Sequence, residues 1–516
     1  MSNRDPSYLT TIRAQVDRLA PVFAALAVAA IVTIAFGARW RFLDSSPYPI
    51  GIDGFYYAVQ LRSLLHDHQL YYPASPMVFW LMLPGAWALG PIAGAKLGAA
   101  LGTALAAAPA YAIVRRATGE RTAGVTGAAL VATAAGSFHL ATEFVKQGVG
   151  LTLALTFVAT LGAALDAPAG RGRRARFALA AALFAATLLA HASSVGEAVV
   201  FAVPPLWVHV TRGASGRRLT AAALIAAAIA VVAVVVVLLV PAVSRDLGLA
   251  HLFGPASTDF FGRHAFHDEV PLGALAAGLL VVGIVFRRGR GSPASAGPGA
   301  PSAESRALLV GPAAFALVLA LPWLSSRDPD GLIFRLRIMA FVPLAICAPV
   351  AIAQLTAAVR ASVRQLLLIA ASVALLAFVP LRYVDAVNWP NLSFMPGVAA
   401  VADHTPPSAI IIAKDRQLAF MVKWAADREA RTRPLRADAR PTFWLASPGV
   451  LPPTVLRDLE GFEERLPAQL PRPVRLFPKK PKWMMMILFA EPTWQALIQA
   501  ASPADRAHLE PWARLP

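Results

Sequence analysis

An acidic residue, Asp53, stands in the segment that follows the first long apolar run of the chain. A carboxylate at the edge of a bilayer is costly unless it faces water, a partner or a metal ion. When it lies within hydrogen-bond reach of a hydroxyl group, it can accept the hydroxyl proton. We therefore predict that Asp53 is a catalytic base. The alternative is that Asp53 caps a short helix that begins at Gly54 or Phe55, since aspartate is a favoured N-cap residue.

Aromatic and basic side chains follow this carboxylate in the same segment. Tyr56 and Tyr57 come first, then Arg62, and then the pair Tyr71 and Tyr72. Tyrosine rings can stack on a sugar or a prenyl chain, which would make Tyr56, Tyr57 and Arg62 substrate-binding residues. Tyrosine is also enriched at membrane–water interfaces without any role in binding. For the rings, this simpler interpretation is favoured.

A second polar group lies near residue 140. His139 and Glu143 are four residues apart, which places both on one face of a helix. Together with Asp53 they would offer oxygen and imidazole ligands to a divalent cation such as Mg²⁺, Mn²⁺ or Zn²⁺. Glu143 is also the second candidate for a catalytic carboxylate, and Lys146 is a candidate phosphate ligand. The alternatives are that His139 and Glu143 face water at a helix end, and that Lys146 extends its charge to the interface.

Further basic residues precede later apolar runs. Arg335 and Arg337 are candidate phosphate ligands, because a guanidinium group makes bidentate contacts with phosphate oxygens. Side chains two residues apart on a helix point in different directions, so we expect only one to serve, with a slight preference for Arg337. His191 and Glu197 form an ionisable pair near a span end, which is either a substrate-binding element or a mutually satisfied structural pair.

Titratable residues also gather near the end of the segment 243–270. Their spacing matches no zinc motif, so we interpret the segment as a solvated loop or a mobile lid over the acceptor. The residues concerned are Arg263, His264, His267, Asp268 and Glu269.

Composition defines the class of protein that must position these groups. The chain has 516 residues, of which 57% are hydrophobic and only 15% charged, whereas soluble domains contain roughly 25% charged residues. Several apolar runs are long enough to cross about 30 Å of hydrocarbon as helices. The single cysteine, Cys347, cannot form a disulfide within the chain. We therefore predict a polytopic α-helical membrane protein.

Arginines cluster in the short connections between the apolar runs, at 115–121, 171–176, 212–218, 287–290 and 360–364. Taking these loops as cytoplasmic gives about eleven transmembrane helices, with the N-terminus inside and the C-terminal region outside. The same loops, facing anionic headgroups, account for the net charge of +18. Nucleic acid is therefore not an expected partner, and the plasma (inner) membrane is the expected location.

The predicted spans leave one short apolar segment, 77–89, which is interrupted by proline and is expected to lie at the interface. We predict spans at about 19–38, 93–114, 122–142, 148–166, 177–193, 195–211, 219–242, 271–286, 307–324, 338–356 and 365–380.

The same pattern predicts two domains. Residues 1–380 form a transmembrane domain, and residues 381–516 form a small mixed α/β domain on the extracytoplasmic side. Within the second domain, 408–413 and 483–489 are expected to be strands. The outer loops expected to carry the chemistry are 39–76, 139–148, 243–270 and 325–337.

Read together, these features resemble the superfamily C glycosyltransferases, which include protein O-mannosyltransferases, aminoarabinose transferases and oligosaccharyltransferases. The resemblance covers roughly residues 20–360. It rests on Asp53 in the first outer loop, the paired tyrosines after it, the turn 143–146 and the arginine-bearing loop before 338. In that family the first-loop acidic residue acts at the acceptor or a metal and is often one of a pair, whereas here glycine follows Asp53.

The resemblance implies a cell-envelope glycosyltransferase. It would move a sugar from a polyprenyl phosphate or pyrophosphate carrier to a lipid, protein or polysaccharide acceptor on the extracytoplasmic face. One direct displacement would invert the anomeric carbon, with Asp53 as base. Two other functions stay open: a transporter or flippase of a lipid-linked saccharide, and a non-catalytic membrane scaffold. Against a transporter, no internal repeat is visible and the polar residues lie at span ends rather than mid-span.

Overall fold

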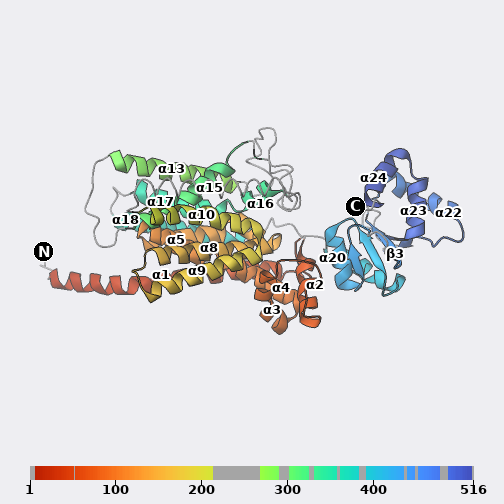
Figure 1. The fold of residues 1–516 in the computed structure, drawn as a ribbon, viewed down its shortest axis with the longest axis horizontal. Coiled ribbons are helices and arrows are strands. Elements are labelled where there is room, and N and C mark those ends of the chain that lie inside the picture. Colours follow the sequence, from red (N-terminus) through yellow and green to blue (C-terminus); the bar gives the residue numbers. More distant parts are fainter. Residues whose placement is uncertain are drawn as a thin grey trace. The chain divides into compact units, whose positions relative to one another are not determined.

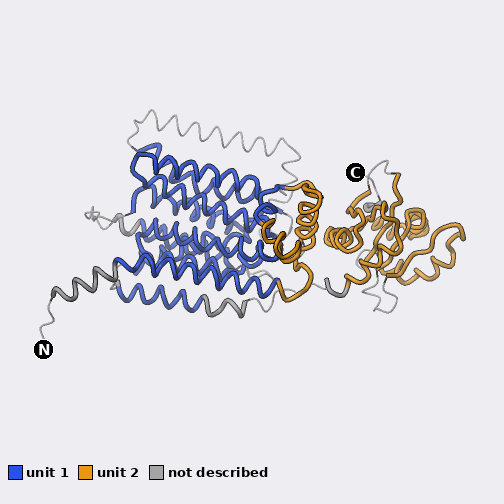
Figure 2. The backbone as a smooth tube through the Cα atoms, turned by 90° about the horizontal axis from the view of Figure 1, so that it is seen from below, with its two compact units in different colours: residues 1–43, 75–81, 96–386 blue, residues 44–74, 82–95, 387–516 orange. Residues whose placement is uncertain are grey.

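The computed structural model describes residues 6–51, 53–212, 268–289, 301–322, 324, 331–356, 361–382, 391–434, 439–447, 451–476 and 486–513. These residues form two compact units (Figure 2). Unit 1 comprises residues 1–43, 75–81 and 96–386, and unit 2 comprises residues 44–74, 82–95 and 387–516. The predicted span 219–242 and most of the predicted loop 243–270 lie outside the described residues.

Unit 1 is a bundle of helices (Figure 1). Its helices are α1 (Pro6–Leu43), α5 (Ala107–Thr118), α6 (Arg121–Thr133), α7 (Ala135–Thr142), α8 (Val145–Leu165), α9 (Arg171–Ala190), α10 (Ala192–Thr211), α13 (Glu269–Gly289), α14 (Ala303–Ala307), α15 (Val310–Leu319), α16 (Leu332–Ile338), α17 (Phe341–Leu355) and α18 (Ala361–Arg382). Two further helices, α3 (Met77–Leu89) and α4 (Pro91–Ala104), contain residues of both units.

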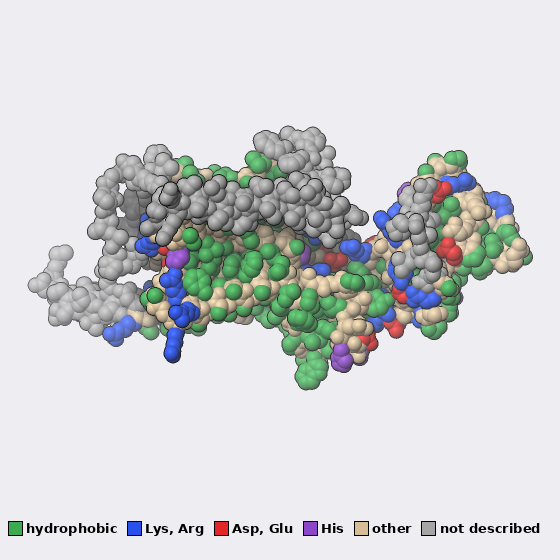
Figure 3. All heavy atoms as spheres, in the orientation of Figure 1, with side chains coloured by type: hydrophobic (Ala, Val, Ile, Leu, Met, Phe, Trp, Pro, Cys, Tyr) green, Lys and Arg blue, Asp and Glu red, His purple; other side chains and the backbone are tan. Residues whose placement is uncertain are grey.

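Hydrophobic side chains cover much of the flank of unit 1 that faces the viewer in Figure 3. Among the described residues, four helical segments are long and apolar enough to cross a membrane, or six if each of two bent helix pairs is one span. The segment 77–89 is a helix of 13 residues, too short to cross without tilting or thinning the bilayer. The mostly helical architecture with apolar helices is thus confirmed, while the number of spans and their orientation stay predictions.

One predicted span, 122–142, is broken in the middle. Helices α6 and α7 meet at an angle of 47° around Ala134, whose backbone is extended. A break inside an apolar bundle leaves backbone groups without helical partners, and these must be satisfied within the protein. The buried carboxylate of Glu269 accepts hydrogen bonds from the amides of Ala135 (2.7 Å) and Gly136 (3.1 Å).

A buried arginine makes hydrogen bonds with residues on both sides of this break. The Arg39 side chain is fully buried, and its guanidinium group donates to the carbonyl of Ala132 (3.3 Å) and the hydroxyl of Ser137 (2.8 Å). Because Arg39 and Glu269 come from α1 and α13, two distant parts of the chain fix the start of α7. This start in turn sets the position of the α7–α8 turn.

A second broken span packs against the first. Helices α16 and α17 meet at 41°, and a Cβ atom added at Gly136 would lie 2.1 Å from the carbonyl oxygen of Ile338, at the end of α16. It would also lie 2.9 Å from the Phe341 ring. The two helix breaks are therefore in direct contact, and only glycine fits at position 136.

Gly136→Ala is accordingly expected to lower the free energy of unfolding by about 1–3 kcal/mol, the usual cost of overpacking. Gly196→Ala is the matched control, because a Cβ atom at that helical position meets nothing within 4 Å. The control is expected to be neutral or slightly stabilising. Thermal unfolding of the two purified variants makes the comparison, and equal melting temperatures would refute the tight contact between the breaks.

Unit 2 contains a five-stranded sheet of order β2-β1-β3-β5-β4. Strand β1 pairs with β2 and β3 in parallel, and β5 pairs with β3 and β4 in antiparallel fashion. The strand predicted at 408–413 is confirmed as β1, and the described end of the segment 483–489 lies in β5. The strands are β1 (Ile410–Ala413), β2 (Glu429–Arg431), β3 (Thr442–Ala446), β4 (Val474–Arg475) and β5 (Ile487–Ala490).

Alternating apolar residues of the strands build the core of this sheet. The indoles of Trp444 and Trp494 stack with centroids 5.1 Å apart, and the ring of Phe489 packs edge-on against Trp494. The helices of unit 2 are α2 (Gly54–His66), α19 (Asn391–Ala400), α20 (Arg416–Ala425), α21 (Pro453–Arg457), α22 (Leu459–Arg465), α23 (Glu491–Ala500) and α24 (Pro503–Ala513), with a short 3₁₀ helix at Val401–His404.

Helix α2 follows Asp53 directly and belongs to the same compact unit as this sheet. It packs against α20, which lies between strands β1 and β2 in the chain. The sequence places the first loop and the C-terminal region more than three hundred residues apart, and no local pattern indicates that they associate.

Candidate active site

One end of unit 1 gathers the polar residues predicted around position 140. Helix α7 ends at Thr142 and α8 begins at Val145, so the predicted turn that contains Glu143 is confirmed. Glu143 lies in this turn and Lys146 in the first turn of α8, and both are half-buried. The rings of His139 and Phe144 lie 5.6 Å apart across the turn. A carboxylate and an ammonium group three residues apart are therefore both partly exposed at this end of α8.

Gln147 connects this turn to two other helices. The buried side-chain amide of Gln147 donates a hydrogen bond to the backbone carbonyl of Arg335 in α16 (2.7 Å). The backbone carbonyl of Gln147 accepts a hydrogen bond from the Ser194 hydroxyl in α10 (3.2 Å). A buried polar side chain with such bonds is expensive to displace. Gln147 thus holds α8, α10 and α16 together next to Lys146.

His191 occupies the turn between α9 and α10, near the same cluster. Its Nδ1 atom lies 2.7 Å from the Ser193 hydroxyl. A Cβ atom added at Gly150 of α8 would lie 3.0 Å from the Cβ atom of His191. His191 therefore packs directly against α8, the helix that carries Lys146 and Gln147.

The two predicted arginines have different surroundings. The Arg337 side chain is only 2% exposed and donates to the carbonyl of Leu324 (3.1 Å). The Arg335 side chain is half-buried, and its guanidinium carbon lies 5.8 Å from the centre of the Phe144 ring. Only one of the pair was expected to serve, and the geometry favours Arg335 over the slightly preferred Arg337.

The predicted pair of His191 and Glu197 is not formed. The His191 Nδ1 atom bonds with Ser193 instead, and neither carboxylate oxygen of Glu197 has a hydrogen-bond partner among the described residues. Glu197 is 2% exposed, inside α10. Ser193 is one helical turn nearer to His191 along α10 than Glu197 is, and its hydroxyl is the group that bonds to the imidazole.

Asp53 is described within unit 2. It occupies the N-cap position of α2, but its side chain makes no capping hydrogen bond. The residue is half-buried. The capping alternative therefore lacks the side-chain hydrogen bond that a cap would make, and the catalytic role of Asp53 stays a prediction.

The tyrosines after Asp53 are core residues of unit 2. Tyr56 and Tyr57 are 8% and 3% exposed. The Tyr56 ring lies 6.1 Å from Tyr72 and 5.2 Å from Phe420 of α20. The Gln60 side chain makes two hydrogen bonds with the backbone of Tyr72, which fixes the segment after α2. These contacts give the aromatic cluster a packing role between α2 and α20.

Arg62 of α2 makes hydrogen bonds with the C-terminal end of α20. Its guanidinium group donates to the carbonyls of Lys423 (2.8 Å) and Trp424 (2.9 Å) and lies over the Trp424 ring at 4.8 Å. Cations are favoured at a helix C-terminus, where carbonyl groups lack helical partners. The predicted substrate-binding role of Arg62 stays a prediction, and the structure gives it a second role in holding the Asp53 segment.

Arg62→Gln is expected to lower the free energy of unfolding by about 2 kcal/mol, since it removes charged hydrogen bonds and a cation–π contact. Arg457→Gln is a matched control, because Arg457 is an exposed arginine of the same unit that bonds only within its own helix. Thermal unfolding of both variants tests the expectation. Unchanged stability combined with a raised KM would assign Arg62 to the substrate instead.

The predicted metal site needs three ligands in one place. No group of three or more His, Cys, Asp or Glu side chains that could hold a metal ion occurs in the part of the chain that the structure describes. A site formed by Asp53, His139 and Glu143 stays a prediction, which loss of activity on chelation and its recovery with Mg²⁺, Mn²⁺ or Zn²⁺ would test.

Three supporting residues were not predicted from the sequence: Arg39, Gln147 and Glu269. Glu269 was included in a solvated loop, although it is the first residue of α13 and is buried. Arg39 directly follows the predicted first span, which could have indicated a charge inside the bundle. For Gln147 the sequence carries no signal, because its partners lie on α10 and α16.

Comparison with solved structures supports the fold. The chain is similar to ArnT from Cupriavidus metallidurans bound to undecaprenyl phosphate, with a TM-score of 0.50 and 14% identity over 90% of this chain and 97% of that one. The apo state of the same protein gives a TM-score of 0.51 and 15% identity over 91% and 98%. No protein-family model and no curated protein matches the sequence. The chain therefore has an ArnT-like fold along nearly its whole length.

Proposed function

We propose that this protein is a membrane glycosyltransferase that takes a sugar from a polyprenyl phosphate or pyrophosphate carrier. Three observations support the proposal. The fold is that of ArnT, which was solved with undecaprenyl phosphate bound and is a superfamily C aminoarabinose transferase. Gln147, the neighbour of Lys146, bonds to the backbone carbonyl of Arg335, and the Asp53 side chain makes no capping hydrogen bond with α2.

The hydrogen bond from Gln147 to the Arg335 carbonyl carries the proposal furthest, because it joins the start of α8, which holds Lys146, to the helix that holds Arg335. Breaking the bond between the anomeric carbon and the phosphate oxygen leaves an additional negative charge on the phosphate. Preorganised cations stabilise such a charge most effectively when it develops in the transition state. Guanidinium and ammonium groups are suited to this task, the first by bidentate contact and the second as a point charge.

Asp53 supplies the complementary step in this proposal. Its carboxylate accepts the proton of the acceptor hydroxyl as the hydroxyl oxygen attacks the anomeric carbon. The glycosidic bond forms, the carbon–phosphate oxygen bond breaks, and the electron pair leaves with the carrier. A single displacement of this kind inverts the anomeric configuration. The reaction would take place on the extracytoplasmic face, with a lipid, protein or polysaccharide as acceptor.

A donor panel tests the proposal. Membranes that contain the full-length protein are given one labelled sugar on polyprenyl phosphate, polyprenyl pyrophosphate or UDP, and labelled acceptor is measured against membranes without the protein. We expect incorporation from a lipid-linked donor only. Equal incorporation from the nucleotide sugar would refute the carrier assignment, and lack of incorporation from every lipid-linked donor would refute the enzyme class.

A further inference from the structure

An apolar cavity of about 360 Å³ lies between α8, α9 and α10, far from the candidate active site. Phe157, Phe177 and Phe184 form its walls, and the small side chains of Ala180 and Ala181 leave the space between them. Valines of α10 on its rim are 42% and 50% exposed. The cavity is thus a surface groove in the hydrophobic flank of unit 1 (Figure 3).

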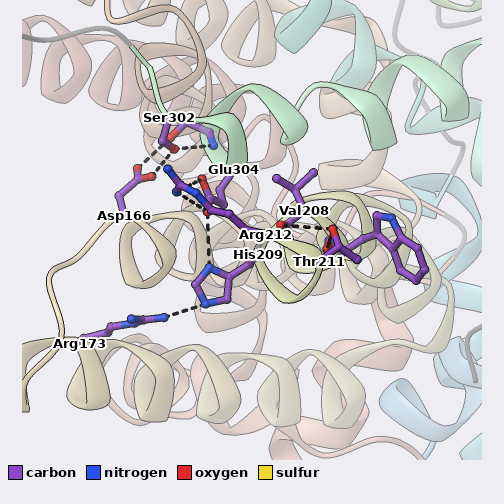
Figure 4. Close-up of polar contacts among 10 residues, drawn as sticks. Asp166, Arg173, Val208, His209, Thr211, Arg212, Ser302 and Glu304 are labelled. Atoms are coloured by element: carbon purple, nitrogen blue, oxygen red, sulfur yellow. Dashed lines mark hydrogen bonds and ion pairs between the residues drawn. The ribbon is translucent and has the colours of Figure 1, made fainter. Parts of the chain in front are cut away.

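The guanidinium group of Arg173 lies at one end of this groove. The guanidinium carbon of Arg173 lies 5.5 Å from the centre of the Phe177 ring, which is part of the lining. On the opposite wall His209 follows Leu206 by three residues, and its Nε2 atom is 2.7 Å from an Arg173 nitrogen (Figure 4). Since guanidinium can only donate, Nε2 is the acceptor, and the His209 proton is on Nδ1.

The charge of Arg173 is not neutralised by a carboxylate within the described residues. Glu304 is the acidic group near His209, with its Oε1 atom 3.6 Å from Nδ1. That carboxylate already accepts two contacts from Arg212, at 2.9 and 3.2 Å (Figure 4). The His209 imidazole therefore lies between Arg173 and the paired Glu304 and Arg212, and no described carboxylate pairs with the Arg173 cation.

The groove lies at the arginine-rich end of the bundle. Helix α8 has 21 residues and is about 30 Å long, and Lys146 belongs to its first turn while the groove residue Leu161 lies near its last. Two exposed arginines, Arg171 and Arg174, flank Arg173 on α9. The groove is therefore separate from the predicted carrier phosphate site.

We propose that this groove binds an anionic phospholipid, with one acyl chain between the phenylalanine rings and the phosphodiester on Arg173. Basic pockets between transmembrane helices on the cytoplasmic side are suited to anionic headgroups. The Arg173 cation attracts the phosphodiester of either headgroup but repels the additional cation of a zwitterionic one, and so favours a lipid of net negative charge. The proposal does not depend on the glycosyltransferase activity.

Native mass spectrometry of the full-length protein in micelles tests the site with chain-matched phosphatidylglycerol and phosphatidylcholine. We expect phosphatidylglycerol to be retained about fivefold more strongly, the effect of one cation near a lipid headgroup. Arg173→Gln should abolish this preference, whereas Arg171→Gln, which removes the same charge from an exposed position, should keep it. Ala181→Trp fills the groove and should reduce retention of both lipids.

Four results would overturn the proposal. Equal retention of the two lipids, or equal losses in the Arg173 and Arg171 variants, would show that no specific headgroup site exists. Unchanged lipid retention in Ala181→Trp would show that something else, such as an apolar segment of this chain, occupies the groove. Displacement of phosphatidylglycerol by glycerophosphate at equal concentration would show a free-phosphate site, whereas no displacement supports the acyl-chain contribution.

Discussion

Asp53→Asn should lower the rate of sugar transfer by about 10²- to 10⁴-fold, the usual contribution of a general base. Asparagine has nearly the same shape but cannot accept the hydroxyl proton. The side chain of Asp53 makes no capping hydrogen bond with α2, so the substitution removes no helix cap. We therefore expect kcat to fall while the melting temperature changes little.

Initial rates with a saturating lipid-linked donor measure this effect. Asp67→Asn is the matched control: Asp67 lies at the other end of α2, is exposed, and accepts a hydrogen bond from Ser63. The control should retain wild-type kcat. If Asp53→Asn transfers sugar at the wild-type rate, Asp53 has no part in the reaction.

The second large effect concerns the phosphate of the carrier. Lys146→Met and Arg335→Gln should each lower kcat/KM by about 10²- to 10³-fold, as expected when one preorganised partner of a developing charge is removed. Arg337→Gln should lower the melting temperature instead, because the Arg337 side chain is buried against the Leu324 carbonyl. Steady-state kinetics with a lipid-linked donor and thermal unfolding distinguish variants that lose activity from a variant that loses stability.

Arg115→Gln serves as the control for charge alone, since Arg115 is exposed on unit 1 in α5, which contributes nothing to the cluster. It should leave both kcat/KM and stability unchanged. The assignment of the phosphate site would be contradicted by normal kinetics in the Lys146 and Arg335 variants. A larger kinetic loss in a stable Arg337 variant would return the phosphate role to that residue.

Hydrophobicity correctly predicted the elements that are apolar along most of their length. The expected spans at 148–166, 177–193 and 195–211 lie close to α8, α9 and α10, and the isoleucine run at 410–412 is part of β1. Such elements depend on the local chain alone: a long apolar run must form a helix in a bilayer, and β-branched residues favour a strand.

The helix breaks depended on distant residues and were not predicted. The sequence stays apolar through Ala134, with no proline there to end α6. The interruption is stable because Arg39 and Glu269 satisfy the exposed backbone groups. The association of α2 with α20 is of the same kind, since Arg62 finds its carbonyl partners only after the chain has folded.

Some properties of the predicted site residues could likewise be inferred from the sequence, and others depended on the folded structure. Residue type and spacing placed Lys146, His191 and Arg335 among the candidates, and in the structure α8 contacts both the His191 turn and the Arg335 backbone. Sequence could not separate Arg335 from Arg337, because burial decides which guanidinium group is committed to the protein. Nor could it show that Tyr56 and Tyr57 are core residues, since their packing partners belong to the C-terminal sheet domain.

Release of the carrier tests the central claim most directly. Purified protein in liposomes is supplied with a sugar on polyprenyl phosphate and with acceptor, and both the transferred sugar and the polyprenyl phosphate are quantified by mass spectrometry. We predict one carrier molecule released for each sugar transferred, and neither product with the Asp53→Asn variant. Movement of the intact donor across the bilayer, without release of the carrier, would contradict the account and identify a flippase.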